Sequence, residues 1–364
     1  MTQRRTFLIV AVAVLGLGIA IWLLTQSSHA PESTTTAAGP KSAGPGAPSA
    51  APASVANGSA LKFSSLSPIE RSAFMAEMRE RDPALIFQAM LDAGRIDLDR
   101  RKQLSIQAVL AYALRTKAPE AGLLDQMHKI ISDASHPNSE RAVVLGVLIA
   151  AQTRGTTEIL LQLAGSLTDK TLRKMAISGV RTISSSWGDG TFHEEMSHPL
   201  EQAWRESQEQ ELLISVAVAM AQVGAANGIG LLLDSALREQ GRDDVRARAA
   251  CGALGYATIL NPNAVPPLSA ILASQPPGSI SSQLASDTLA RIPIPAAAKA
   301  LVNWLQNDEG NAAPLAREYV IQSTSPAQLA AWEAALDPSV PFRSEKNRDA
   351  IRAGLAEYRK NRGG

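Results

Sequence analysis

The 364-residue chain has a single cysteine and few aromatic residues. One cysteine excludes an internal disulfide and any CxxC motif. We expect Cys251 to be a small, buried apolar residue of a helix rather than a reactive thiol. Phe, Trp and Tyr make up only 4% of the residues, and alanine and leucine carry most of the apolar content. This composition favours helices over strands, which prefer aromatic and β-branched residues.

The sequence also lacks a strong charge of either sign and the common catalytic motifs. The formal net charge is +1, which gives no electrostatic bias toward nucleic acid. There is no P-loop and no G-x-S-x-G motif. Gly228-Ile229-Gly230 does not follow a predicted strand, so it is not a dinucleotide-binding fingerprint. We therefore assign no catalytic, cofactor-binding or metal-binding residue and expect no cofactor.

One long apolar run is present near the N-terminus. Residues 7–24 are 18 consecutive uncharged, apolar residues, preceded by Arg4 and Arg5. About 20 such residues span a bilayer, and the positive-inside rule keeps the arginines in the cytoplasm. We predict a transmembrane helix over 7–25 that follows a cytoplasmic segment 1–6. The protein would then be a single-pass protein of a bacterial inner membrane with its main domain in the periplasm. The alternative is a cleaved signal peptide and a secreted protein.

Residues 26–60 are rich in Ala, Ser, Thr, Pro and Gly and carry little charge. Such a segment cannot bury enough apolar surface to fold, so we predict a disordered linker. As a flexible chain it would span roughly 30–35 Å. It would tether a folded domain, residues 61–342, to the membrane.

The most regular part of that domain is residues 244–274. Val245, Ala249, Ala253 and Ala257 lie four residues apart and predict one face of a helix. Asn261–Asn263 interrupt the pattern, with Asn263 expected to cap a second helix over 265–274. Each helix is too short to be stable alone, so the pair must stack on neighbouring pairs.

This unit resembles a HEAT repeat, in particular the short alanine-rich kind of phycobilisome-lyase-like proteins. The residues that carry the resemblance are Val245-Arg246, Ala249-Ala250, Leu254-Gly255 and Ala264-Val265-Pro266. The turn over 256–263 is longer than the usual one. The resemblance implies an α-solenoid and implies no activity.

Similar helix patterns continue along the rest of the domain, and Ser67-Pro68 marks its first helix. Arg141 and Arg173 begin helices 32 residues apart, a spacing typical of helical repeats. We predict an all-α fold of about seven HEAT-like helix pairs. Besides the pair described above, the predicted helices are 69–81, 83–93, 97–116, 121–132, 140–153, 157–167, 171–183, 211–223, 282–291, 296–306, 313–322 and 326–336. Trp204, Trp304 and Trp332 are expected to pack in the core.

An insertion, 184–210, interrupts the repeats and holds the best candidates for chemistry. These are Trp187, Asp189, His193, Glu194, Glu195 and His198. HEEMSH is one residue longer than the zinc motif HExxH, so its two histidines would lie about 140° apart on a regular helix. We expect a loop that packs Trp187 and Phe192 onto the repeats. The alternative is a loop that brings His193, His198 and a carboxylate together around a metal.

The C-terminal stretch 343–364 carries seven basic and three acidic residues. Ile351, Leu355 and Tyr358 share one face, which predicts a capping helix. A basic patch for an acidic partner or lipid headgroups is the alternative.

We predict a scaffold that is tethered to the membrane, binds a protein or peptide on the repeat surface and has no catalytic activity. Nucleic acid is not an expected partner. Two alternatives stay open: an enzyme or lyase-like factor with its site in 184–210, and a structural spacer of an envelope complex.

Overall fold

The computed structural model describes residues 66–94, 100–117, 122–188, 190–238 and 245–362. The predicted membrane segment 7–25 and linker 26–60 lie outside these residues. Within the described part of the chain, no helix is long and apolar enough to cross a membrane. This part contains seventeen α-helices, one 3₁₀-helix and an isolated β-bridge, but no strand. The predicted all-α class is confirmed for it.

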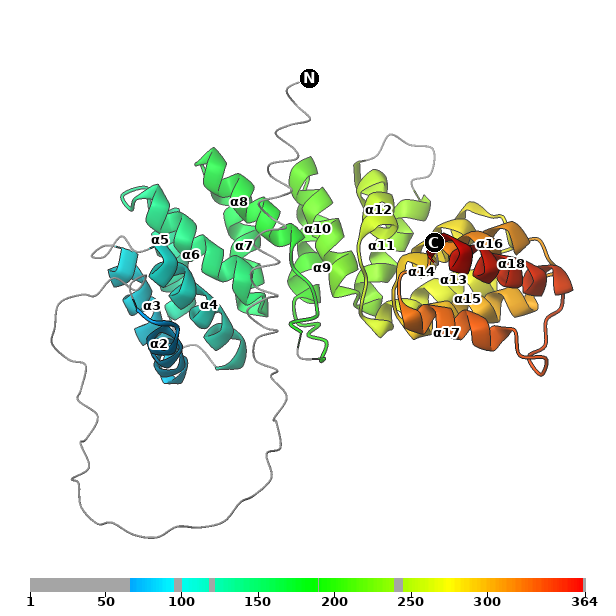
Figure 1. The fold of residues 1–364 in the computed structure, drawn as a ribbon. Coiled ribbons are helices and arrows are strands. Elements are labelled where there is room, and N and C mark those ends of the chain that lie inside the picture. The colour runs from blue at the N-terminus through cyan, green and yellow to red at the C-terminus, as the bar shows by residue number, and fades with distance from the viewer. Residues whose placement is uncertain (1–65, 95–99, 118–121, 189, 239–244, 363–364) are drawn as a thin grey trace, which may run out of the picture. The chain divides into compact units, whose positions relative to one another are not determined.

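The helices follow one another closely, mostly through short turns (Figure 1). Their bounds are α2 Pro68–Glu80, α3 Pro83–Asp92, α4 Arg100–Thr116, α5 Leu123–Ser132, α6 Asn138–Ala151, α7 Arg154–Ser166, α8 Lys170–Arg181, α9 Ser197–Glu206, α10 Gln210–Val223, α11 Ala226–Arg238, α12 Val245–Tyr256, η3 Pro262–Ala264, α13 Val265–Ser274, α14 Ile280–Arg291, α15 Pro295–Asn307, α16 Ala313–Ile321, α17 Pro326–Ala335 and α18 Glu345–Arg362.

The helices form two layers, each packed mainly on its neighbours in the chain. In the first layer, each even-numbered helix from α2 to α14 contacts the next even-numbered one. In the second layer, the odd-numbered helices from α5 to α17 do the same. The buried apolar side chains between the layers form one continuous cluster. The described residues thus form a helical-repeat architecture of eight successive pairs, α2/α3 to α16/α17, followed by α18.

One pair more than predicted is present because two helices were not predicted: α9, which lies in the segment taken as an insertion, and α11, which follows α10. Pro199, Leu200 and Trp204 are buried, and α9 packs between α7 and α11 in the second layer. Pro199 hid this helix in the sequence. It occupies the first turn, where a missing N–H costs no intrahelical hydrogen bond. The true departure from the repeat is therefore only residues 182–196.

Local capping sets several helix starts. Ser67 and Glu70 form a capping box in front of Pro68, as the Ser67-Pro68 pair predicts. Asp169 accepts hydrogen bonds from the N–H groups of Thr171 and Leu172 and so caps α8. The expectation for Asn263 is wrong. Asn261 instead accepts from the Asn263 N–H and starts the 3₁₀-helix η3 before α13.

Helix α12 has the predicted alanine face. Ala249, Ala253 and Leu254 are buried, and the helix packs against α10, α11 and α14. Small side chains allow these helices to approach closely. The prediction that Cys251 is buried is wrong, because the buried face is narrow and Cys251 lies outside it, exposed. Desolvation by its neighbours still raises the pKa of the thiol.

Side-chain amides tie the turns within successive pairs together along one edge of the repeats, here called the turn edge. Gln152 donates to the carbonyl of Thr182 at 3.2 Å, and Asn261 donates to that of Val223 at 3.0 Å. Gln328 donates to Ile292 at 2.8 Å. These bonds satisfy carbonyls that helix ends leave without a partner, so at these three places one repeat is fixed to the next.

Arginines perform the same task on the opposite edge. The Nε atoms of Arg141 and Arg173 donate to the carbonyls of Ile131 and Ala164 at 2.8 and 2.9 Å. Each carbonyl lies near the end of the preceding second-layer helix. The 32-residue spacing seen in the sequence therefore marks one recurring contact between a helix start and the previous helix end.

The last helix covers the end of the array. In α18, Ile351 and Leu355 are buried against the preceding helices, chiefly α16. Several of its arginines form ion pairs, including exposed Arg359 with Glu333 at 2.7 Å and largely buried Arg348 with Glu345 at 3.0 Å. Pairing of this kind reduces the excess positive charge of the stretch. The tryptophans at 204, 304 and 332 are all buried, as predicted.

Candidate functional site

The clearest departure from the repeat is the connection between α8 and α9, residues 182–196, here called the strap. An isolated β-bridge joins Ser186 to Phe192, and the His193 N–H donates to the Ser185 carbonyl at 2.8 Å. Gly188 and Gly190 have φ values of +86° and +83°, which favour glycine. The strap therefore contains a tight turn. The predicted site residue Asp189 lies outside the described residues.

One part of the strap reaches back over two repeats to α4. The Trp187 ring stacks on the His193 ring, with centroids 3.4 Å apart and planes at 14°. The Arg115 guanidinium lies 5.5 Å from the Trp187 centroid, a cation–π contact. Arg115 is itself fixed by donating to the carbonyls of Ala150 and Ala151 at the end of α6. The indole is thus held between Arg115 of α4 and His193 of the strap, and α6 acts on it only through Arg115.

The other part of the strap reaches forward to the turn between α12 and α13. Glu194 Oε1 accepts hydrogen bonds from the side-chain amides of Asn261 and Asn263, each at 2.6 Å. Asn261 is fully buried and also donates to the Val223 carbonyl. The strap therefore spans the turn edge from the end of α4 to the start of α13.

A groove of about 370 Å³ lies where the end of α4, the start of α7 and the strap meet. Three cations, Arg115, Lys117 and Arg154, line it together with one carboxylate, Glu195, and Trp187. The Lys117 ammonium donates to the carbonyls of Arg79 and Arg81 at 2.7 and 3.1 Å. Backbone carbonyls fix Arg115 and Lys117 in place, and Arg154 pairs with Glu158 at 2.9 Å. The lining residues themselves include three cations and one carboxylate.

The indole of Trp187 adds an unsatisfied donor to this groove. Its Nε1 atom is buried and has no hydrogen-bond partner among the described residues. An unpaired buried N–H costs about 1–3 kcal/mol, so the ring is held in place at some cost in free energy. The groove itself combines a flat aromatic side chain with an excess of basic over acidic side chains.

The histidines of the strap region do not converge. His193 stacks on Trp187 and contacts the Thr191 hydroxyl through Nε2 at 2.8 Å, whereas His198 is exposed in the first turn of α9. Glu195 is 3.9 Å from His193 Nδ1. Within the described ranges, no group of three or more His, Cys, Asp or Glu residues is placed to hold a metal ion.

The predicted packing of the two aromatic residues is half right. Trp187 packs onto the repeats, but Phe192 is 41% exposed. Sequence reasoning missed Arg115, Lys117 and Asn261, because each stands at a helix end where polar residues are ordinary. The only usable signal was the Arg-Thr-Lys run that ends the predicted helix 97–116.

Comparison with known proteins adds no family. A scan against protein-family models finds no match, and no curated protein matches the sequence.

Proposed function

We propose that this protein is a HEAT-like helical-repeat scaffold that is tethered to a membrane and binds a protein or peptide at the strap. The tether is the predicted span 7–25, which places the repeats in the periplasm of a bacterial cell. The proposal agrees with the repeat architecture, in which each pair contributes surface as well as core.

The observation that carries the proposal is the groove beside the strap. Trp187 offers a wide rigid ring, and the cations around it offer long-range attraction and hydrogen bonds. Its indole N–H is buried without an acceptor, so a ligand carbonyl or carboxylate that reached it would satisfy it. Such a mixture of aromatic area and placed polar groups is typical of peptide recognition rather than of bond-making chemistry.

The groove is preorganised, because contacts within the protein already hold its side chains and the strap in place. Arg115 is held by the end of α6, and Glu194 fixes the strap to the α12–α13 turn. A ligand would therefore bind without ordering this loop first, which removes part of the entropic cost of association.

Site-specific photo-crosslinking in the native membrane tests the proposal. A photoreactive residue replaces Thr116, which is exposed and lines the groove. A matched control replaces Gln162, which is exposed on α7 away from the groove. We expect a reproducible crosslinked protein from position 116 and none from position 162. If neither position, nor a third probe at Phe192, crosslinks any protein in intact cells, the scaffold proposal is wrong.

A separate measurement tests the tether. The N-terminus of the mature protein is sequenced after membrane fractionation and alkaline extraction. An intact N-terminus in the extracted membrane pellet supports the anchor. A new N-terminus after residue 25 in the soluble fraction would favour the secreted form.

A further inference from the structure

Basic and acidic residues nearly balance over the whole chain, but the fold distributes them unequally between the two helix layers. Among side chains that the structure describes, α4, α6, α8, α10 and α12 carry nine basic residues: two on α4, one on α6, four on α8 and two on α12. They carry two acidic residues, Glu140 and Glu211. The second-layer helices α5, α7, α9, α11 and α13 carry three basic and five acidic ones. Positive charge is therefore concentrated in the first layer.

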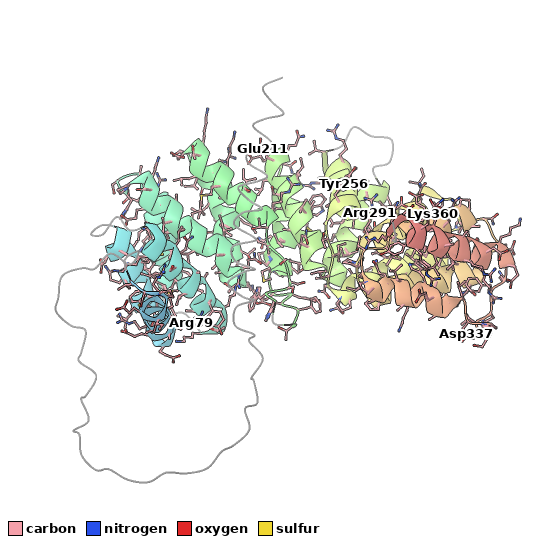
Figure 2. The ribbon with its side chains drawn as sticks, viewed as in Figure 1. Arg79, Glu211, Tyr256, Arg291, Asp337 and Lys360 are labelled. Atoms are coloured by element: carbon pink, nitrogen blue, oxygen red, sulfur yellow. The ribbon has the colours of Figure 1, made fainter. Side chains whose placement is uncertain are left out.

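Four of these nine basic residues are exposed to solvent: Lys170, Lys174, Arg181 and Arg248. The others are buried or half-buried, and Arg173 is paired with Glu209. Both acidic residues lie in the first turn of their helices, so no carboxylate follows later in any of the five. We call the solvent-exposed side of these five helices the outward face. Farther along, Figure 2 shows Arg291 of α14 close to Tyr256, with the guanidinium 5.6 Å from the ring centroid. Tyr256 is 88% exposed.

Between the cations the same face is apolar. On α4, Leu104, Ala108 and Tyr112 are exposed at every fourth position, and this line continues to Thr116 in the groove beside the strap. On α6 the partly exposed residues after the first turn are also uncharged, Val143 and Ile149 among them. The face thus has uncharged residues on α4 and α6 beside exposed cations on α8. This arrangement is complementary to a ligand that has one apolar side and one acidic side.

We infer that the outward face of α4–α12 binds an acidic amphipathic helix of the partner protein. This inference rests on the proposed function and extends it from the groove to the adjoining face. The apolar side of such a helix would lie on α4 and α6, and its carboxylates would meet Lys174 and Arg181 of α8. Nucleic acid fits this face less well. Its charged phosphates would lie on the uncharged side chains of α4 and α6, which cannot bind them.

Two synthetic peptides and a DNA duplex test the inference with the full chain in a neutral detergent. Both peptides have leucines at helical spacing. The remaining positions are all glutamate in one peptide and all lysine in the other. The test variant is Lys174→Glu with Arg181→Glu, two exposed residues whose side chains form no ion pair or hydrogen bond with the described part of the chain. The control, Lys129→Glu with Lys299→Glu, makes the same charge change in the second layer. Binding is measured by fluorescence anisotropy at two salt concentrations.

We expect the glutamate peptide to bind in preference to the lysine peptide and more weakly at high salt. The α8 variant should weaken binding about tenfold or more, whereas the second-layer control should change it less than about twofold. Equal binding of both peptides, equal loss in both variants, or binding of the DNA alone overturns the inference. If the peptide test fails but a protein still crosslinks to position 116, the proposed function stands and only the acidic-helix inference is wrong. If the crosslinks are absent as well, the proposed function and the inference both fail. Circular dichroism of each variant confirms that the fold is retained.

Discussion

Two helical glycines in opposite surroundings show how tightly single residues are packed. A Cβ on Gly354 would lie 2.9 Å from the Arg317 carbonyl oxygen and 2.9 Å from the Val320 Cβ, both closer than real contacts allow. A Cβ on Gly252 would meet no atom within 4 Å. The first glycine allows α16 and α18 to touch; the second only loosens α12.

We therefore expect opposite signs for the same substitution. Gly354→Ala should lower the free energy of unfolding by roughly 1–3 kcal/mol, because backbone must move to admit the methyl group. Gly252→Ala should raise it by about 0.5–1 kcal/mol through helix propensity. Denaturant melts followed by circular dichroism measure both values. A Gly354→Ala protein as stable as the wild type would contradict the close approach of these helices.

At the scale of elements, the strap depends on one carboxylate. Glu194→Ala removes the acceptor shared by Asn261 and Asn263. Asn261 keeps its bond to Val223, so the repeats should stay folded while the strap loosens. Limited proteolysis should cut residues 182–196 several times faster than in the wild type. The neighbouring exposed residue provides the control, Glu195→Ala, and equal cleavage of both variants would show that Glu194 does not hold the strap.

The start of α8 makes a prediction about pH. The N–H of Leu172, which donates to Asp169, is the main cause that holds the pKa of that carboxyl below its ordinary value, and the Thr171 N–H adds to it. Because the folded pKa is depressed, the stabilisation is complete above the unfolded pKa of about 3.9 and is lost as pH falls through the folded value. Asp169→Asn should therefore melt below the wild type at neutral pH, and the difference should shrink below about pH 4. A difference in melting temperature that does not vary with pH would contradict this role.

At the scale of the whole molecule, the stabilising contacts should be distributed along the array of helix pairs rather than gathered in one central core. Each pair is buried only by its neighbours, and α18 supplies the last cover through Ile351, Leu355 and the buried amide of Asn347. A chain that ends at residue 342 should lose hydrogen-exchange protection in α14–α17, while α4–α10 keep theirs. Uniform loss of protection over all described helices would show a single cooperative unit instead.

The large-scale fold could be predicted because local patterns repeat. Alanine and leucine at helical spacing, Pro at first turns and polar caps predict most helices to within a few residues. The same local rules failed at 184–210, where Pro199 and a histidine-rich run concealed α9. They also failed for Cys251, because the width of the buried face depends on how α10 and α14 pack against α12.

The sequence by itself determined the helical class, the repeat period and capping residues such as Ser67 and Asp169, since these depend on neighbours within a few positions. Only the tertiary structure decided that Arg115, Trp187 and Glu195 line one groove and that Glu194 meets Asn261, because these contacts join residues dozens of positions apart. It also decided the electrostatics. The net charge of the chain is only +1, yet basic residues are concentrated in the first layer. This separation arises because the two helices of each pair belong to different layers.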